Sequence, residues 1–181
     1  MLQEFRNKLR DRQDLASRIS LVEADAGSFR LDQTFPAAFM AGSFDHLGDD
    51  DQRLVSLANI ARHLEDGAKL TLDSYPGLMS DSPLKLSDEI QLKGTRYRRL
   101  IGRQIQPDRT VKITLIYEIY RGNKLSERIE QFSFAGMIDL KRIRALLNEA
   151  GFEVVGEYRD YQLAPYRPGD ELLLIETQKG A

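Results

Sequence analysis

The sequence predicts an α/β protein whose mostly parallel sheet is accompanied by an antiparallel meander. Three features lead to this prediction. Short apolar runs at 19–22, 35–41 and 69–72 each end in a loop of small or polar residues. A segment with helical periodicity separates the second run from the third, and strands joined through helices or crossovers favour a parallel sheet. Residues 111–120 instead place apolar side chains at every second position, which is typical of an antiparallel strand with one apolar face.

The first segments in chain order predict a helix and two short strands. Leu2, Phe5 and Leu9 fall at i, i+3 and i+7, so we expect a helix that packs a narrow apolar stripe on the sheet. Residues 19–22 predict a short buried strand. Residues 35–41 predict a second strand, with a proline near its start, where a missing hydrogen-bond donor matters least.

Two amphipathic helices and three further strands complete the predicted sheet. Asp49 and Gln52 form a capping-box pattern at the start of the first helix. Asp139 is a candidate N-cap for the second helix, and Gly151 suits the left-handed position after its last turn. The strands are expected at residues 69–72, 152–158 and 172–177.

The middle of the chain differs in character from its two ends. Turn sequences flank the alternating strand, so we expect segments near 97–106 and 127–134 to pair with it as an antiparallel meander. We therefore interpret residues 1–181 as one domain, in which residues 95–135 form an antiparallel insertion or lid.

Composition limits the partners and the chemistry. A formal net charge of -2, a pI near 5.8 and the lack of a recurring basic face argue against binding to nucleic acid or to an anionic membrane. A chain without cysteine has no disulfide, thiolate metal site or cysteine nucleophile, and two histidines argue against a zinc centre. No apolar run reaches the length of a signal peptide or a membrane span, so we predict a soluble, cytoplasmic protein.

Five short phrases occur in an order and at spacings that resemble a known family. They read LVEAD at 21–25, SFDHL at 43–47, ARHLEDG at 61–67, LTLD at 70–73 and LNEAGFEVV at 147–155. Together they resemble the C-terminal two-thirds of a class I S-adenosylmethionine-dependent methyltransferase, and the resemblance covers nearly all 181 residues. It implies a Rossmann-like sheet with an antiparallel last strand. It also implies a small-molecule acceptor, because the predicted meander suits a cover over such a substrate.

The sequence departs from the family in the segment that binds the cofactor. Family members open with a strand, a glycine-rich turn and a helix, and a second strand then ends in an acidic residue that holds the ribose. In this sequence no two of the thirteen glycines are separated by a single residue. The opening Met-Leu is similar to the start of the helix that follows the acidic residue. We therefore expect a truncated Rossmann-like sheet, from a truncated gene product or one half of a split enzyme.

The family sheet order 3-2-1-4-5-7-6 implies a gap where strands 1 and 2 are missing. Residues 19–22 either move next to residues 37–41, or a partner chain supplies strands, or the segment is poorly ordered. We expect direct closure or a contact at the exposed edge, with a homodimer or a complementing chain as the partner.

The resemblance also implies where S-adenosylmethionine binds. The Asp25 carboxylate would accept a hydrogen bond from the adenine amino group while the Ala26 amide donates to a ring nitrogen. The alternative for Asp25 is a turn residue bonded to nearby backbone amides. The alternative for the first two residues is a frayed terminus. The implied cofactor-binding residues are Met1, Leu2, Asp25, Ala26, Ser43 and Phe44.

Candidate catalytic and substrate-binding residues follow the predicted strands. His46 is a candidate base for an acceptor hydroxyl or amine, because the unperturbed pKa of histidine lies near neutrality, and the alternative is a bond to a loop carbonyl. Tyrosines supply aromatic walls with one polar tip, although they also commonly pack sheets. The candidates for an acceptor pocket are Tyr75, Tyr117 and Tyr161.

Three functions remain open from the sequence. The first is a methyltransferase for a small molecule, with this chain a truncated or split form that is inactive alone. The second is a non-catalytic, methyltransferase-like interaction subunit whose exposed sheet edge pairs with another protein. The third is a small-ligand binding module that uses the meander as its wall.

Overall fold

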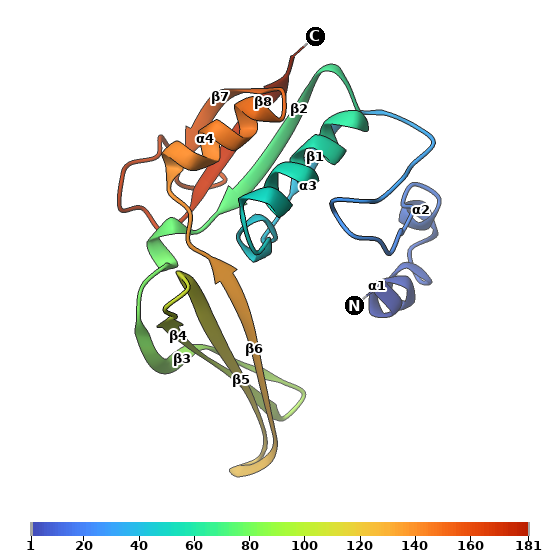
Figure 1. Ribbon diagram of the computed structural model, residues 1–181. Coiled ribbons are helices and arrows are strands. Elements are labelled where there is room, and N and C mark those ends of the chain that lie inside the picture. The colour runs from blue at the N-terminus through green and yellow to red at the C-terminus, as the bar shows by residue number, and fades with distance from the viewer. Residues whose placement is uncertain (1, 181) are drawn as a thin grey trace.

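The computed structural model describes residues 2–180, which form two four-stranded sheets and four α-helices (Figure 1). The mixed sheet has the strand order β1-β2-β8-β7. Its strands are β1 (Phe35–Met40), β2 (Leu64–Ser74), β7 (Phe152–Tyr158) and β8 (Leu173–Lys179). The second sheet is antiparallel, with its strands in sequential order. They are β3 (Ser82–Leu92), β4 (Thr95–Ile105), β5 (Thr110–Arg121) and β6 (Lys124–Gly136).

The mixed sheet agrees with the predicted order of its strands. β1 and β2 are parallel, and Ala38 lies opposite Leu70. β8 runs antiparallel to both β2 and β7. This is the order 4-5-7-6 that the resemblance implies for the last four strands of the family sheet. The carboxyl ends of β1 and β2 therefore lie at the same edge.

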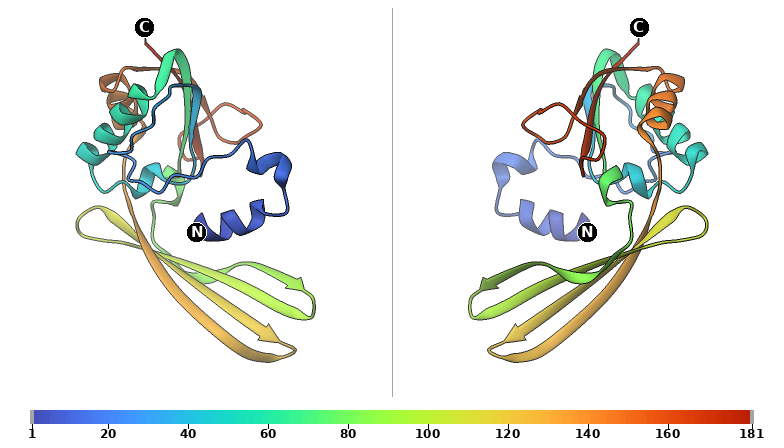
Figure 2. Two further views of the ribbon diagram at one scale, coloured as in Figure 1. Left: turned by 90° about the vertical axis from the view of Figure 1, so that its right-hand side faces the viewer. Right: turned by 90° about the vertical axis from the view of Figure 1, so that its left-hand side faces the viewer.

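Helices α3 (Asp50–Arg62) and α4 (Leu140–Glu149) cover one face of the mixed sheet (Figure 2). Both begin at the predicted caps. The Asp49 carboxylate accepts a hydrogen bond from the Gln52 amide at 2.8 Å, and the Asp139 carboxylate accepts one from the Arg142 amide at 2.8 Å. The core lies between these helices and the sheet, and its fully buried members include Leu57, Leu70, Leu72, Ile143, Leu146, Leu147, Phe152 and Ile175.

The prediction that the first helix packs on the sheet is wrong. α1 (Leu2–Leu9) forms as expected, but it has no buried residue, and Phe5 is 41% exposed. α1 and α2 (Gln13–Ala16) stand beyond the sheet face that α3 and α4 do not cover (Figure 2). The apolar stripe predicts an amphipathic helix, and nothing in its spacing specifies which surface covers the stripe.

No helix among residues 2–180 has the length and apolar composition needed to cross a membrane.

Residues 19–22 do not form the predicted strand, and direct closure of the sheet does not occur. The segment has no strand assignment and no ladder partner, so β1 is an edge strand in the described chain. A short, mostly apolar segment forms a strand only when a neighbouring strand satisfies its backbone, and the segment between α2 and β1 instead runs past α3. The outer edge of β1 is left open.

The antiparallel sheet begins earlier than the sequence suggests. β3 starts at Ser82, within a stretch whose polar composition predicts no strand. All but the first of its residues are exposed, but Leu84, Leu86, Ile90 and Leu92 occupy alternate positions, a strand pattern that the polar residues between them obscure. β3 is defined by its ladder to β4, in which Ile90 pairs with Tyr97.

The short 3-10 helix η2 (Pro76–Leu78) is held close to the loop before β8, which predicts a strong effect of Gly77→Ala. A Cβ at Gly77 would lie 2.5 Å from the Glu171 Cα and 2.7 Å from the Asp170 carbonyl oxygen, both backbone atoms that cannot turn away. We expect the free energy of unfolding to fall by about 2 kcal/mol, measured by urea denaturation. Gly180→Ala is the control, because its Cβ would meet only one atom, at 3.6 Å. Equal stability of the two variants would contradict the close approach.

Candidate functional site

A cavity of about 410 Å³ lies where the carboxyl ends of β1 and β2 meet the antiparallel sheet. In open α/β sheets this edge is where ligands bind. The mixed-sheet side and the segments after it contribute one wall, with Gly42, Asp45, His46, Asp73, Tyr75, Leu78 and Met79. The antiparallel sheet contributes the other, with Arg99, Ile101, Arg103, Val111, Ile113 and Ala135. Both walls of the cavity are thus formed from strands and the segments joined directly to them.

Asp73 is a buried carboxylate that connects the segments of the first wall by hydrogen bonds. It lies near the end of β2 with only 2% of its surface exposed. One carboxylate oxygen accepts a hydrogen bond from the Gly42 amide at 2.5 Å, and the other accepts from the Tyr161 hydroxyl at 2.8 Å and the Tyr75 hydroxyl at 3.3 Å. The hydrogen bond to Asp73 raises the pKa of Tyr161 well above its usual 10.0. The carboxylate therefore joins the loop after β1, the segment after β2 and the loop before β8.

Asp45 forms a second buried acidic group at the same edge. Its carboxylate accepts hydrogen bonds from the Ser74 hydroxyl at 2.7 Å and the Tyr75 amide at 2.8 Å. Burial raises the pKa of Asp45 above its usual 3.8, although both hydrogen bonds oppose that shift. The two bonds fix the 3-10 helix η1 (Phe44–His46) against the end of β2.

The raised pKa of Asp45 predicts a characteristic dependence of stability on pH. Between 3.8 and the higher folded-state pKa, the folded chain binds a proton that the unfolded chain has released. This contribution to stability therefore falls as the pH rises through that window. Asp45→Asn keeps the shape, and the Ser74 hydroxyl can turn from donor to acceptor.

We expect Asp45→Asn to gain stability relative to the parent as the pH rises from about 4 to 7, in urea denaturation at a series of pH values. Taking the difference between the two proteins cancels the carboxylates whose pKa is lowered, such as Asp50. A difference that is constant over this range would rule out a perturbed Asp45.

His46 presents one ring nitrogen to a backbone carbonyl. Its Nδ1 lies 2.8 Å from the carbonyl oxygen of Phe134 on β6. Because a carbonyl only accepts, Nδ1 carries the proton in this contact, and in the neutral ring Nε2 is left with the lone pair. The carbonyl bond and a role as base are therefore compatible, since each uses a different nitrogen.

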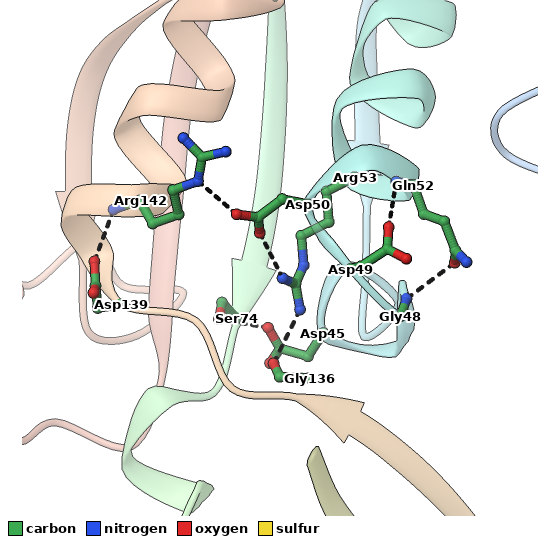
Figure 3. A network of polar contacts seen from close by, with 10 residues as sticks. All are labelled: Asp45, Gly48, Asp49, Asp50, Gln52, Arg53, Ser74, Gly136, Asp139 and Arg142. Atoms are coloured by element: carbon green, nitrogen blue, oxygen red, sulfur yellow. Dashed lines mark hydrogen bonds and ion pairs between the residues drawn. The ribbon is translucent and has the colours of Figure 1, made fainter. Parts of the chain in front are cut away.

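Arg53 links α3 to the end of β6 in the antiparallel sheet (Figure 3). Its side chain is 4% exposed, donates to Asp50 at 3.0 Å and to the carbonyl of Gly136 at 3.1 Å, and lies over the ring of Phe44. Asp50 in turn accepts from Arg142 on α4 at 2.6 Å. The network fixes the end of β6, and with it the second wall, against α3 and α4.

A second groove, of about 730 Å³, follows the open edge of β1. Ala26 and Ser43 both line it, together with Phe39, Met40 and Ile60. One side of this groove is the segment before β1, which is held on α3 by hydrogen bonds. The Asn59 amide donates to the carbonyls of Ala26 and Phe29 at 3.2 Å each, and the Leu31 amide donates to Nε2 of His63 at 3.2 Å.

The structure separates several residues that the resemblance groups around the cofactor. The Asp25 carboxylate accepts from the Gly27 amide at 2.8 Å, which is the bonding of a turn residue. The Phe44 side chain is fully buried in the core. Leu2 lies on α1 and borders a separate pocket with Phe5, and Met1 lies outside the described residues.

Two of the three candidate tyrosines lie together at Asp73, and the third lies elsewhere. Tyr75 and Tyr161 meet at Asp73, and Tyr75 lines the 410 Å³ cavity. Tyr117 does not line that cavity. It lies directly across the β4–β5 ladder from Arg99 and lines a different groove farther out on the antiparallel sheet.

Sequence reasoning missed four charged residues at this site. Asp73 stands in a phrase that resembles the family and at the end of a predicted strand, so its position was a usable signal. Asp45 occupies a similar place one loop earlier. The other two, Arg99 and Arg103, lie in a charged segment that also fits the solvated flank of a strand, and only the fold reveals which face they share.

No model of a protein family matches the sequence, and no curated protein matches it. Solved structures do. An S-adenosylmethionine-dependent methyltransferase from Clostridium acetobutylicum is similar with a TM-score of 0.78 and 14% identity, over 99% of this chain and 71% of that one. CalS10, an amino pentose methyltransferase from Micromonospora echinaspora solved with bound S-adenosylmethionine, has a TM-score of 0.68 and 18% identity, over 86% and 63%. The sugar N-methyltransferase KedS8 from Streptoalloteichus has a TM-score of 0.69 and 19% identity, over 94% and 67%.

The chain therefore spans between 63% and 71% of the length of these three proteins. The similarity extends over both the mixed and the antiparallel sheet, since it covers most of this chain. Identities this low establish the fold alone. The chain has the α/β fold of the class I S-adenosylmethionine-dependent methyltransferases.

Proposed function

We propose that this chain is the acceptor-binding part of an S-adenosylmethionine-dependent methyltransferase that acts on a small molecule. The observation that carries the proposal is the 410 Å³ cavity at the carboxyl ends of β1 and β2, within a methyltransferase fold. Its volume suits a small molecule, and its lining combines apolar side chains with a few polar groups. The named activities of the solved neighbours, on an amino pentose and a sugar amine, are consistent with such an acceptor.

The groove along β1 fits one end of the cofactor. Its lining is mostly apolar, as an adenine ring requires, and Ser43 at its border lies next to Gly42, which lines the acceptor cavity. Ala26 and Ser43 would hold the adenosyl end, and the Asp25 oxygen that is not bonded to Gly27 remains for the amino group. When bound, S-adenosylmethionine supplies a methyl group already activated on a sulfonium.

In such a reaction the residues of this chain orient the reactants and accept a proton. Orientation lowers much of the barrier, and Asp73 fixes the loop after β1 through its bond to the Gly42 amide. His46 Nε2 accepts the proton that an acceptor hydroxyl or amine releases, while Nδ1 keeps its bond to Phe134. The antiparallel sheet excludes water from the acceptor side.

We further propose that a β-α-β segment with a glycine-rich turn pairs with the open outer edge of β1, next to the end of the groove that takes the cofactor. The outer edge of β1 offers unpaired backbone groups, and Val22 and Phe39 beside it are 54% and 58% exposed. About a third of the length of each of these solved neighbours lies outside the part that this chain covers. Without that segment we expect the chain to be inactive by itself.

The test is to read the coding sequence around this chain and to express the completed protein. We expect an in-frame Gly-x-Gly segment, upstream or in a neighbouring open reading frame. Together with the present chain it should bind S-adenosylhomocysteine at least a hundredfold more tightly than the chain alone, by calorimetry. A completed protein that binds no better than the chain alone would contradict the proposal.

A non-catalytic interaction subunit is the second candidate, and the same open edge of β1 favours it. In that case another protein, or a second copy, adds a strand to β1 and no methyl transfer follows. Light scattering of the purified chain separates this candidate, because a strict monomer with no partner argues against pairing at the edge. A small-ligand binding module without methyl transfer would retain acceptor binding but show no response to the cofactor.

A further inference from the structure

The antiparallel wall of the acceptor cavity carries two arginines on one face. Arg99, Ile101 and Arg103 occupy alternate positions on β4, so their side chains point to the same side of the sheet. All three line the cavity, and Ile113 lies directly across the ladder from Arg103. The wall is therefore apolar in its middle and basic at two points.

The two guanidinium groups are not saturated by the protein. Arg99 pairs with Asp88 at 2.5 Å through one terminal nitrogen. Within residues 2–180, the Arg103 side chain makes no ion pair and no side-chain hydrogen bond. The Nε atom of each arginine is buried without a hydrogen-bond partner. After the pair with Asp88 is taken into account, about one positive charge remains on this wall.

The opposite wall carries acidic side chains, and their carboxylates already accept hydrogen bonds from the protein. Asp73 accepts three hydrogen bonds and Asp45 accepts two, all from groups of the protein. An anionic ligand group is repelled at that wall and attracted at the arginine wall. The cavity is therefore built to orient a ligand with one negative end.

We propose that the acceptor carries a carboxylate, which binds the Arg103 guanidinium with help from Arg99. The planar fork of an arginine matches the two oxygens of a carboxylate, and a single negative charge balances the one that remains. The apolar body of the acceptor lies against Ile101 and Ile113, and its nucleophile points toward His46. This inference rests on the proposed function, because it takes the cavity as the acceptor site.

The test uses the 181-residue chain and matched probes. A panel of small aromatic and aliphatic carboxylates, including para-aminobenzoate, is compared with the corresponding amides by titration with NMR detection of the arginine Nε–H signals. We expect at least one carboxylate to bind roughly tenfold more tightly than its amide and to shift the signals of Arg99 and Arg103. If no carboxylate in the panel binds more tightly than its amide, the proposal is wrong.

Substitutions of single arginines test which of them causes the preference for a carboxylate over its amide. Arg103→Gln should abolish the preference for the carboxylate, and Arg103→Lys should restore part of it, since lysine keeps the charge but not the fork. Arg121→Gln at the far end of β5 removes the same charge from the same sheet and should leave the preference unchanged. A preference that survives in Arg103→Gln overturns the proposal. The probes do not involve the cofactor, so failure of methyl transfer with an intact preference overturns only the proposed function.

Discussion

Arg53→Met is expected to lower the free energy of unfolding by about 3 kcal/mol. The substitution removes a buried guanidinium and leaves the carbonyl of Gly136, which is itself buried, without its hydrogen bond. It also removes the stacking of the guanidinium over Phe44. The measurement is urea denaturation, and we expect hydrogen exchange to become faster at the end of β6.

Arg142→Met is the matched control, because Arg142 donates to the same Asp50 carboxylate from an exposed position. An exposed ion pair contributes less than about 1 kcal/mol, and Asp50 keeps its bond to Arg53. Equal losses in the two variants would mean that Arg53 does not hold β6 against α3, and the firm position of the second cavity wall would then need another cause.

Asp73→Ala is expected to lose about 3 kcal/mol of stability and to disorder the carboxyl edge of the mixed sheet. Three donors lose their common acceptor, and the Gly42 amide has no other described partner at that position. Since Gly42 and Tyr75 both line the acceptor cavity, binding of any acceptor should weaken together with stability. Urea denaturation and acceptor titration measure the two effects.

Asp73→Asn removes the negative charge of the side chain but keeps its shape. Its carbonyl oxygen keeps the bond to Gly42, and its amide donates to hydroxyls that can turn to accept, so most of the stability should remain. The hydrogen bond and charge that raise the pKa of Tyr161 are lost, so that pKa should fall toward the usual 10.0. Ultraviolet difference titration of this variant beside Tyr161→Phe identifies the phenol. A phenol titration unchanged by Asp73→Asn would contradict the contact.

The elements with local signals could be predicted from the sequence. Asp49 and Asp139 cap α3 and α4 as expected because capping depends on a side chain and an amide three residues away. The alternating residues of β5 form a strand with antiparallel neighbours on both sides. The strand order of the mixed sheet followed from the resemblance and agrees with the structure.

Three elements differ from the prediction. Residues 19–22 have strand composition but no neighbouring strand, and β3 lies in a stretch interpreted as polar but forms a ladder to β4. The apolar stripe of α1 has no surface against it. Residues 19–22 and α1 lack a partner surface within the described chain, whereas β3 pairs with its neighbour β4 across the turn at Lys93 and Gly94.

The candidate site shows the same division. His46 and Tyr75 lie in the segments that follow β1 and β2, and the structure brings both to the acceptor cavity, although their roles remain predictions. Tyr117 lies on the face of β5 next to that cavity but farther along the strand. Position along a strand depends on the register between β4 and β5, which no local pattern specifies.

The most direct measurement is a titration of the chain with S-adenosylhomocysteine, followed through its backbone amide signals. We expect shifts at Ala26, Gly42 and Ser43, where the groove along β1 meets the acceptor cavity, with saturation only at millimolar concentrations for this chain by itself. Shifts that avoid this groove, or no shift there at the highest concentration, would contradict the assignment of the cofactor side and with it the proposed methyl transfer.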